Sequence, residues 1–154
     1  MHHKFDAVLF DCDGVLVDSE PITNGLLRDR LEEQGWTLTP EACYQHFVGK
    51  AVIDEKTRIE AETGKPLTDA WMHSFRARRN AALEAHLQAI PNIHAAIEQI
   101  HLSFDGRIAC ASGADRFKVE LQLAKVALMP YFEGRIFSGH EMPRSKPAPD
   151  VYLA

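Results

Sequence analysis

Apolar residues occur along this chain in short continuous runs and in longer stretches with helical spacing. Residues 7–10 form an unbroken apolar run that ends abruptly at Asp11. A short apolar run bounded by turn residues is typical of a strand buried on both faces of a parallel sheet. Residues 107–111 and 135–137 also contain short apolar runs, and each is followed by a Ser-Gly pair. The pattern therefore predicts three strands, each with polar residues at its end.

Helical patterns fill the stretch between the first and second predicted strands. One helix begins near Pro21 and ends at Gly35, and a second begins at Thr39-Pro40, a Thr N-cap followed by Pro at the first helical position. A third is predicted over residues 52–63, and Thr68 opens a fourth. The fourth is expected to bury Trp71, Phe75 and Ala82 and to expose Arg76, Arg78 and Arg79.

These four helices, with no strand between them, indicate a small all-helical unit inserted after the first strand. Beyond it, helical spacing and strands alternate, with one helix around Ile93 to Ile100 and another marked by Phe117, Leu121, Ala124 and Leu128. Alternation of this kind predicts an α/β fold with a doubly wound parallel sheet and right-handed crossovers. We assign residues 1–17 and 88–154 to this core and residues 18–87 to the helical insertion.

The last residues of the chain read as the first turn of a helix that stops at Ala154. A three-stranded parallel sheet would leave an apolar edge uncovered. We therefore expect the core to be incomplete at its C-terminus and the natural protein to continue. The open edge also makes a dimer or a strand swap an option, so the oligomeric state stays open.

Composition narrows the function classes. The chain has 154 residues, with 17 Lys plus Arg against 22 Asp plus Glu and a formal charge of -5. A mildly acidic chain of this kind is a poor candidate for nucleic-acid binding. Its three cysteines are far apart and form no CxxC pair, which favours a reducing, cytoplasmic compartment. We expect no signal peptide, membrane span or membrane partner.

The candidate chemistry lies at the ends of the predicted strands, where open α/β sheets bind ligands. Asp11 and Asp13 flank Cys12 there, and Gly14 permits a tight turn. Cleaving a phosphate ester with a carboxylate nucleophile requires cations that screen one anion from another, and an acid for the leaving oxygen. Asp11 can attack phosphorus, and Asp13 can protonate the leaving oxygen and later activate water. Ser112 and Gly113 can bind phosphate oxygens, and Lys146 can supply an ammonium group.

At this point the chain resembles a known family. The segments Asp11-Cys12-Asp13-Gly14-Val15-Leu16-Val17-Asp18-Ser19-Glu20, Ala111-Ser112-Gly113 and Ser145-Lys146-Pro147-Ala148-Pro149-Asp150 resemble, in order, the first three motifs of the haloacid dehalogenase-like hydrolases. The helical insertion is similar to the cap of the β-phosphoglucomutase-like branch, which closes over small phosphorylated metabolites. The resemblance implies a Rossmannoid core with a helical cap and a phosphatase that works through an aspartyl-phosphate.

The resemblance also assigns roles to single residues. It implies Asp11 as nucleophile, Asp13 as acid and base, Ser112 as phosphate ligand and Lys146 as the residue that steadies both nucleophile and phosphate. It implies Mg²⁺ as cofactor, bound by the Asp11 carboxylate and the Asp13 carbonyl. Gly49-Lys50 is similar to a cap loop that contacts substrate, so Lys50 is a candidate substrate ligand.

Two departures from the family pattern keep alternatives open. The family's fourth motif, an acidic pair that completes the Mg²⁺ site, is expected beyond Ala154, so this chain alone could be catalytically silent. Thr23 occupies the position where mutase members carry a hinge histidine, which favours a phosphatase over a sugar phosphomutase. Asp13 argues against a true dehalogenase.

A calcium-binding loop is the simplest competing interpretation of the acidic segment. In EF-hand spacing, Asp11, Asp13, Gly14 and Glu20 would stand at loop positions 3, 5, 6 and 12. Leu9 would then occupy the first position, where a carboxylate is needed, and a strand would precede the loop in place of a helix. The hydrolase interpretation is therefore preferred.

Overall fold

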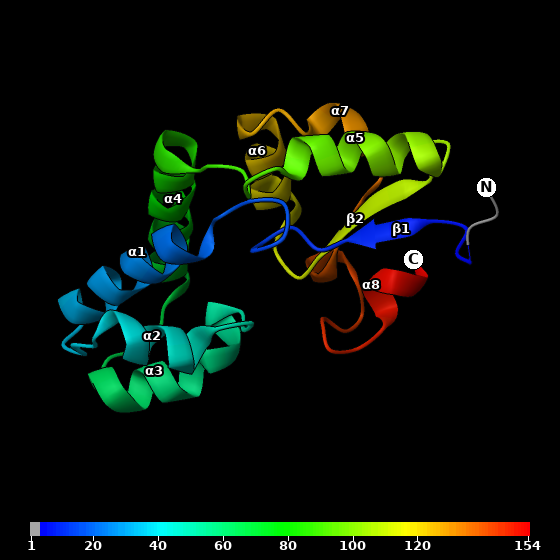
Figure 1. Cartoon of the computed structure of the whole chain (residues 1–154). Helices are drawn as coiled ribbons and strands as arrows, with labels where there is room; N and C mark the ends of the chain where they lie inside the picture. Colours follow the sequence, from blue (N-terminus) through cyan, green and yellow to red (C-terminus); the bar gives the residue numbers. More distant parts are fainter. Residues whose placement is uncertain (1–3) are drawn as a thin grey trace. The chain divides into compact units, whose positions relative to one another are not determined.

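A computed structural model describes residues 4–154 of the chain (Figure 1). The chain divides into two compact units, one of Met1–Ser19 with Leu87–Ala154 and one of Glu20–His86. The first unit holds the sheet and the second is built from helices alone. Among the described residues, no helix is long and apolar enough to cross a membrane.

The sheet unit contains three parallel strands, β1 (Val8–Phe10), β2 (Ile108–Ser112) and β3 (Ile136–Ser138). They lie in the order β1-β2-β3, with Phe10 paired with Cys110 and Ser112 paired with Ser138. In Figure 1, helices α5 (Ile93–Ser103) and α7 (Met129–Phe132) lie on one side of the sheet and α8 (Asp150–Leu153) on the other. The unit is completed by α6 (Arg116–Lys125) and the short η2 (Gly139–Glu141). The α/β class and the parallel sheet are confirmed.

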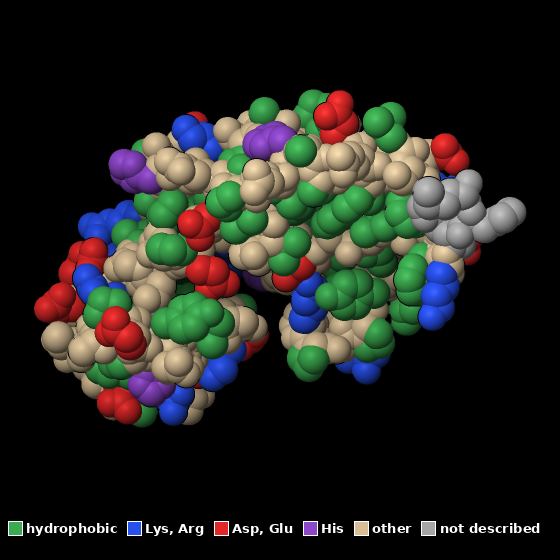
Figure 2. Space-filling view, viewed as in Figure 1, with side chains coloured by type: hydrophobic (Ala, Val, Ile, Leu, Met, Phe, Trp, Pro, Cys, Tyr) green, Lys and Arg blue, Asp and Glu red, His purple; other side chains and the backbone are tan. Residues whose placement is uncertain are grey.

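The first strand is not buried on both faces, and that prediction was wrong. β2, the middle strand, is buried at every position, whereas Leu9 of β1 is 48% exposed and its two neighbours are only half-buried. Within residues 4–154, β1 pairs with β2 alone and is therefore an edge strand of the sheet. Figure 2 shows hydrophobic side chains gathered below α5, where Figure 1 places β1.

The helical unit contains α1 (Glu20–Glu33), α2 (Pro40–Phe47), η1 (Val52–Glu55), α3 (Lys56–Thr63) and α4 (Asp69–His86). The third predicted helix is therefore two pieces, a 3-10 turn followed by an α-helix that ends at Gly64 with positive φ. The unit has its own apolar core, formed by Leu27, Leu31, Trp36, Cys43, Phe47, Ile59, Leu67, Trp71, Met72 and Phe75.

One predicted solvent-facing arginine of α4 is buried, which corrects the sequence interpretation. Arg76 and Arg78 are exposed, but Arg79 is only 8% exposed. Residues four apart share a helix face. Arg79 therefore lies on the same stripe as the buried residues Phe75 and Leu83. Its guanidinium donates to the Asn80 side-chain oxygen at 2.9 and 3.0 Å.

The predicted N-cap of α2 is confirmed, and it leads to a stability prediction. Thr39 Oγ1 accepts a hydrogen bond from Ala42 N at 3.1 Å, and Pro40 occupies the first helical position. Replacing an N-cap threonine by alanine leaves that backbone N–H without its partner. We expect Thr39→Ala to lower the free energy of unfolding by about 1 kcal/mol. Thr39→Ser keeps a hydroxyl at the cap and should retain most of that contribution.

Urea unfolding followed by tryptophan fluorescence measures this loss, because both tryptophans of the chain, Trp36 and Trp71, are buried in the helical unit. Thr57→Ala is the matched control, since Thr57 is exposed within α3. Its free energy of unfolding should change by no more than about 0.5 kcal/mol. Equal losses in the two alanine variants would show that the cap contributes nothing specific.

Candidate active site

Asp11 is the first residue after β1, and its carboxylate is held in place by two donors. Its Oδ1 accepts from Cys12 N at 2.8 Å and lies 3.1 Å from Lys146 Nζ. Both contacts fall on the same oxygen, while the side chain remains 45% exposed. An oriented and accessible carboxylate is what a nucleophile on a phosphate ester requires.

Lys146, in the third predicted motif, contacts both of the other two. Its Nζ donates to Ala111 O at 2.9 Å, at the end of β2, as well as contacting Asp11. Burial lowers the pKa of Lys146, but its hydrogen bonds with Tyr152 and Asp11 outweigh burial and raise that pKa above its usual value. Lys146 is therefore an ammonium at neutral pH, fixed beside the predicted nucleophile.

Ser112 and Gly113 follow β2, and the chain is tightly packed around them. The Ser112 hydroxyl is buried and accepts from Ala114 N at 3.1 Å, which leaves its own hydrogen available to donate. A Cβ on Gly139 would lie 3.4 Å from both Gly113 Cα and Ser112 O. Glycine at position 139 thus lets the end of β3 approach the predicted phosphate loop closely.

Asp13 is surrounded by three donors that meet at one oxygen. Its Oδ1 accepts from Ser19 Oγ at 2.5 Å, from Lys118 Nζ at 2.7 Å and from Gln122 Nε2 at 3.2 Å. Burial alone would raise the pKa of Asp13, but Lys118 and the hydrogen bonds from all three donors lower it below its usual range. The carboxylate form, which can accept a proton from water, is therefore favoured.

Lys118 and Gln122 were missed by the sequence interpretation, which marked this helix by the spacing of its apolar residues, Phe117 and Leu121 among them. In the structure Phe117 is 64% exposed, whereas Lys118 and Gln122 are 7% and 0% exposed. The helix α6 is present as predicted, but its buried face is displaced by one residue. The sequence contained a signal for this buried face. Lys118 and Gln122 are four residues apart and stand next to the apolar residues Val119 and Leu123, which the structure shows to be fully buried.

Cys12, between the two aspartates, is unsuited to act as a nucleophile. The thiol is fully buried. A hydrogen bond with Cys110, burial and the neighbouring Asp13 all raise the pKa of Cys12. Thiolate, the reactive form of cysteine, is thus disfavoured.

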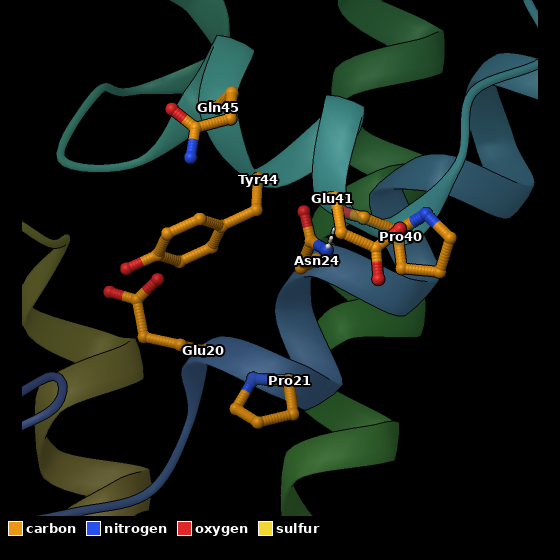
Figure 3. A pocket seen from close by; sticks show the side chains of 7 residues that line it. All are labelled: Glu20, Pro21, Asn24, Pro40, Glu41, Tyr44 and Gln45. Atoms are coloured by element: carbon orange, nitrogen blue, oxygen red, sulfur yellow. Dashed lines mark hydrogen bonds between the residues drawn. The ribbon is translucent and has the colours of Figure 1, made fainter.

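Lys50, the candidate substrate ligand, belongs to the helical unit, where its ammonium lies 3.3 Å from Glu55 Oε1. That unit also contains a cavity of about 290 Å³ between α1 and α2 (Figure 3), lined by Glu20, Pro21, Asn24, Pro40, Glu41, Tyr44 and Gln45. In Figure 3, the Tyr44 hydroxyl and the Glu20 carboxylate point toward one another, and Asn24 donates to Pro40 O at 3.0 Å. None of the site residues predicted from the sequence lines this cavity.

A divalent cation at Asp11 would find few protein ligands. Residues 4–154 contain no group of three or more His, Cys, Asp or Glu side chains arranged to hold a metal. Mg²⁺ is commonly bound through one or two carboxylates, with waters and substrate phosphate completing six oxygen ligands. The Asp11 carboxylate and the Asp13 carbonyl fit a site of that kind only as a partial ligand set.

Comparison with known proteins agrees with the resemblance seen in the sequence. The family model for haloacid dehalogenase-like hydrolases matches residues 5–154. A 6-phosphogluconate phosphatase from Escherichia coli (strain K12) is 31% identical over 148 residues, which cover 95% of this chain and 65% of that protein. The chain thus spans about two thirds of that relative's length.

Solved structures share the fold. A conserved haloacid dehalogenase-like protein of unknown function from Agrobacterium tumefaciens is 29% identical with a TM-score of 0.79, covering 97% of this chain and 66% of that one. A putative beta-phosphoglucomutase from Thermotoga maritima has a TM-score of 0.72 at 23% identity, covering 97% and 68%. The predicted core with an inserted helical unit is therefore confirmed as the fold. On the family match and the shared fold, this chain belongs to the haloacid dehalogenase-like hydrolases.

Proposed function

We propose that this chain is a phosphatase that hydrolyses small phosphorylated metabolites, such as sugar phosphates or phosphoglycolate-like esters, through an aspartyl-phosphate on Asp11. The observation that carries the proposal is the pairing of Asp11 Oδ1 with Lys146 Nζ at 3.1 Å on an accessible carboxylate. The related phosphatase from E. coli, named for a sugar-acid phosphate, supports the substrate class.

The reaction proceeds in two steps. An Asp11 oxygen attacks phosphorus, the bond from phosphorus to the ester oxygen breaks, and the leaving oxygen takes a proton from Asp13. Water then attacks the aspartyl-phosphate, Asp13 accepts its proton, and inorganic phosphate leaves with Asp11 restored. The negative charge of a bound phosphate raises the proton affinity of Asp13, so that Asp13 takes up a proton from solvent as the ester binds and donates it to the leaving oxygen in the first step. Ser112 and the Gly113 N–H bind phosphate oxygens.

Haloacid dehalogenase-like hydrolases generally use Mg²⁺, and we propose the Asp11 carboxylate and the Asp13 carbonyl as its protein ligands here. The cation supplies positive charge at the phosphate, in addition to that of Lys146. The helical unit acts as the cap, with Lys50 as a substrate contact. The three buried free thiols support action in the reducing cytoplasm, without nucleic-acid or membrane partners.

Phosphate release from a substrate panel tests the proposal. The panel contains 6-phosphogluconate, glucose 6-phosphate, glucose 1-phosphate, phosphoglycolate and p-nitrophenyl phosphate, each with Mg²⁺ or with EDTA. We expect release that depends on Mg²⁺ and is fastest for one class of metabolite, which then names the substrate.

Other outcomes select the alternatives. Conversion of glucose 1-phosphate to an isomer without phosphate release would identify a sugar phosphomutase. A folded chain that neither reacts nor binds beryllofluoride with Mg²⁺ would identify a catalytically silent one. The silent alternative is supported by the partial set of metal ligands among residues 4–154.

A further inference from the structure

Asp13 is held at one of its oxygens, by Ser19 of the first motif and by two residues, Lys118 and Gln122, that the family motifs do not include. Three donors, Ser19 Oγ, Lys118 Nζ and Gln122 Nε2, all contact its Oδ1. All three side chains come from the sheet unit, so the cluster is formed within one compact body. A carboxylate whose one oxygen is saturated with donors has a fixed rotamer and a defined free oxygen.

Burial shows that this arrangement is built into the core. Ser19, Lys118 and Gln122 are 1%, 7% and 0% exposed, and the Lys118 side chain is 9% exposed against 22% for Asp13. Lysine is rarely buried to this degree unless it is paired, because the ammonium loses its hydration. Asp13 is the carboxylate 2.7 Å from Lys118 Nζ and therefore compensates that cost.

Gln122 gives a second, independent indication. Its amide nitrogen lies 3.2 Å from Asp13 Oδ1 and 3.6 Å from Cys12 Sγ, while its Oε1 is buried without a hydrogen-bond partner. A buried acceptor without a hydrogen bond costs free energy, so this orientation of the Gln122 amide leaves Oε1 unpaired at a cost in stability. The orientation that is kept is the one that donates to Asp13.

We propose that Lys118 is a positioning residue for Asp13: with Gln122 and Ser19 it anchors Oδ1, so that Oδ2 is the oxygen that exchanges protons with the leaving group and with water. The inference rests on the proposed phosphatase function, and it deepens that function by assigning the two oxygens of Asp13 different roles. It also explains why α6 turns two polar residues toward the sheet.

The test compares Lys118→Met, which keeps the buried stem and removes the charge, with Lys118→Arg, which restores a cationic donor. Lys125→Met is the matched control, because Lys125 lies exposed at the end of the same helix. Each is assayed on the best metabolite of the panel, an ester with a poor leaving group, and on p-nitrophenyl phosphate, whose leaving group needs no proton. A misaligned acid slows the first class selectively.

We expect Lys118→Met to lower kcat/KM, which reports the steps up to release of the alcohol, by about 100-fold on the metabolite and by less than about tenfold on p-nitrophenyl phosphate. Hydrolysis of the aspartyl-phosphate is common to both esters and does not enter kcat/KM. Lys118→Arg should recover part of the loss, and Lys118→Met should add nothing in an Asp13→Asn background. Equal losses of kcat/KM on both esters, or a change in KM alone, would overturn the positioning role.

A wild-type chain that hydrolyses no ester contradicts the proposed function. The contact between Lys118 and Asp13 is then tested by measuring the free energy of unfolding. Urea denaturation of the wild type, Asp13→Asn, Lys118→Met and the double variant forms a thermodynamic cycle. Strongly non-additive losses support the anchoring of Asp13 by Lys118. Additive losses would overturn it, whatever the catalytic result.

Discussion

Asp11→Asn is expected to reduce phosphate release at least about 10⁴-fold, the loss typical of removing a nucleophile that works together with its neighbours. The amide has nearly the shape of the carboxylate and can still accept from Cys12 N, as Asp11 Oδ1 does at 2.8 Å. The substitution therefore removes the attacking charge while it perturbs the backbone little. Release of inorganic phosphate from the best substrate of the panel, with Mg²⁺ present, measures the loss.

The control is Asp6→Asn, a change of the same kind at an exposed aspartate whose backbone oxygen, not its carboxylate, accepts from Arg107. It should leave kcat within about twofold of wild type, because its side chain has no place in the site. Circular dichroism and the urea midpoint establish that both variants are folded. An Asp11→Asn chain that retained a tenth of the activity would exclude the aspartyl-phosphate.

Much of the candidate site could be predicted because its residues stand at fixed places in short motifs. Asp11, Ser112 and Lys146 follow strands or turns that local patterns identify, and parallel strands carry their ends to the same edge. The structure brings Lys146 to Asp11 and to Ala111 O, which joins all three predicted motifs. For Asp11 and Lys146, position along the chain was enough to predict that the two side chains lie together, while their roles stay predictions.

Side chains that depend on non-local partners could not be identified in the same way. Lys118 and Gln122 are residues that composition alone places in solvent, and their burial follows from Asp13, more than 100 positions earlier. Arg79 illustrates the opposite case, since its spacing from Phe75 and Leu83 was visible in the sequence and indicated the buried stripe. The sequence interpretation placed Arg79 in solvent because it is an arginine, although its helical spacing indicated burial.

An uncovered apolar edge of the sheet was expected from the sequence, but not that β1 would be the strand that forms it. An apolar run such as residues 7–10 shows that a strand suits a buried environment, but not whether a second neighbour pairs with it. β2 has partners on both sides and is wholly buried, while β1 has one and leaves Leu9 48% exposed. The composition of a strand and its place in the sheet are separate properties.

Lys146→Met should lower kcat about 10³-fold, because the ammonium is the protein cation that the structure places 3.1 Å from the Asp11 carboxylate. Its charge both orients Asp11 Oδ1 and offsets the repulsion between this carboxylate and an incoming phosphate. Hydrogen bonds with Tyr152 and Asp11 raise the pKa of Lys146, so the charge persists through the neutral pH range of the assay. Methionine keeps the length of the side chain and removes only the charge and the donors.

The matched control is Arg144→Met, two residues earlier, where a 71% exposed guanidinium pairs with Asp150. Removing that surface ion pair should change kcat by less than about threefold, since exposed pairs contribute little and are screened by salt. Lys146→Arg should recover only part of the activity, because a planar guanidinium cannot contact Asp11 Oδ1 and Ala111 O in the same geometry. If Lys146→Met and Arg144→Met lost activity equally, Lys146 would act only through the general field of the protein, and the specific pairing with the nucleophile would be excluded.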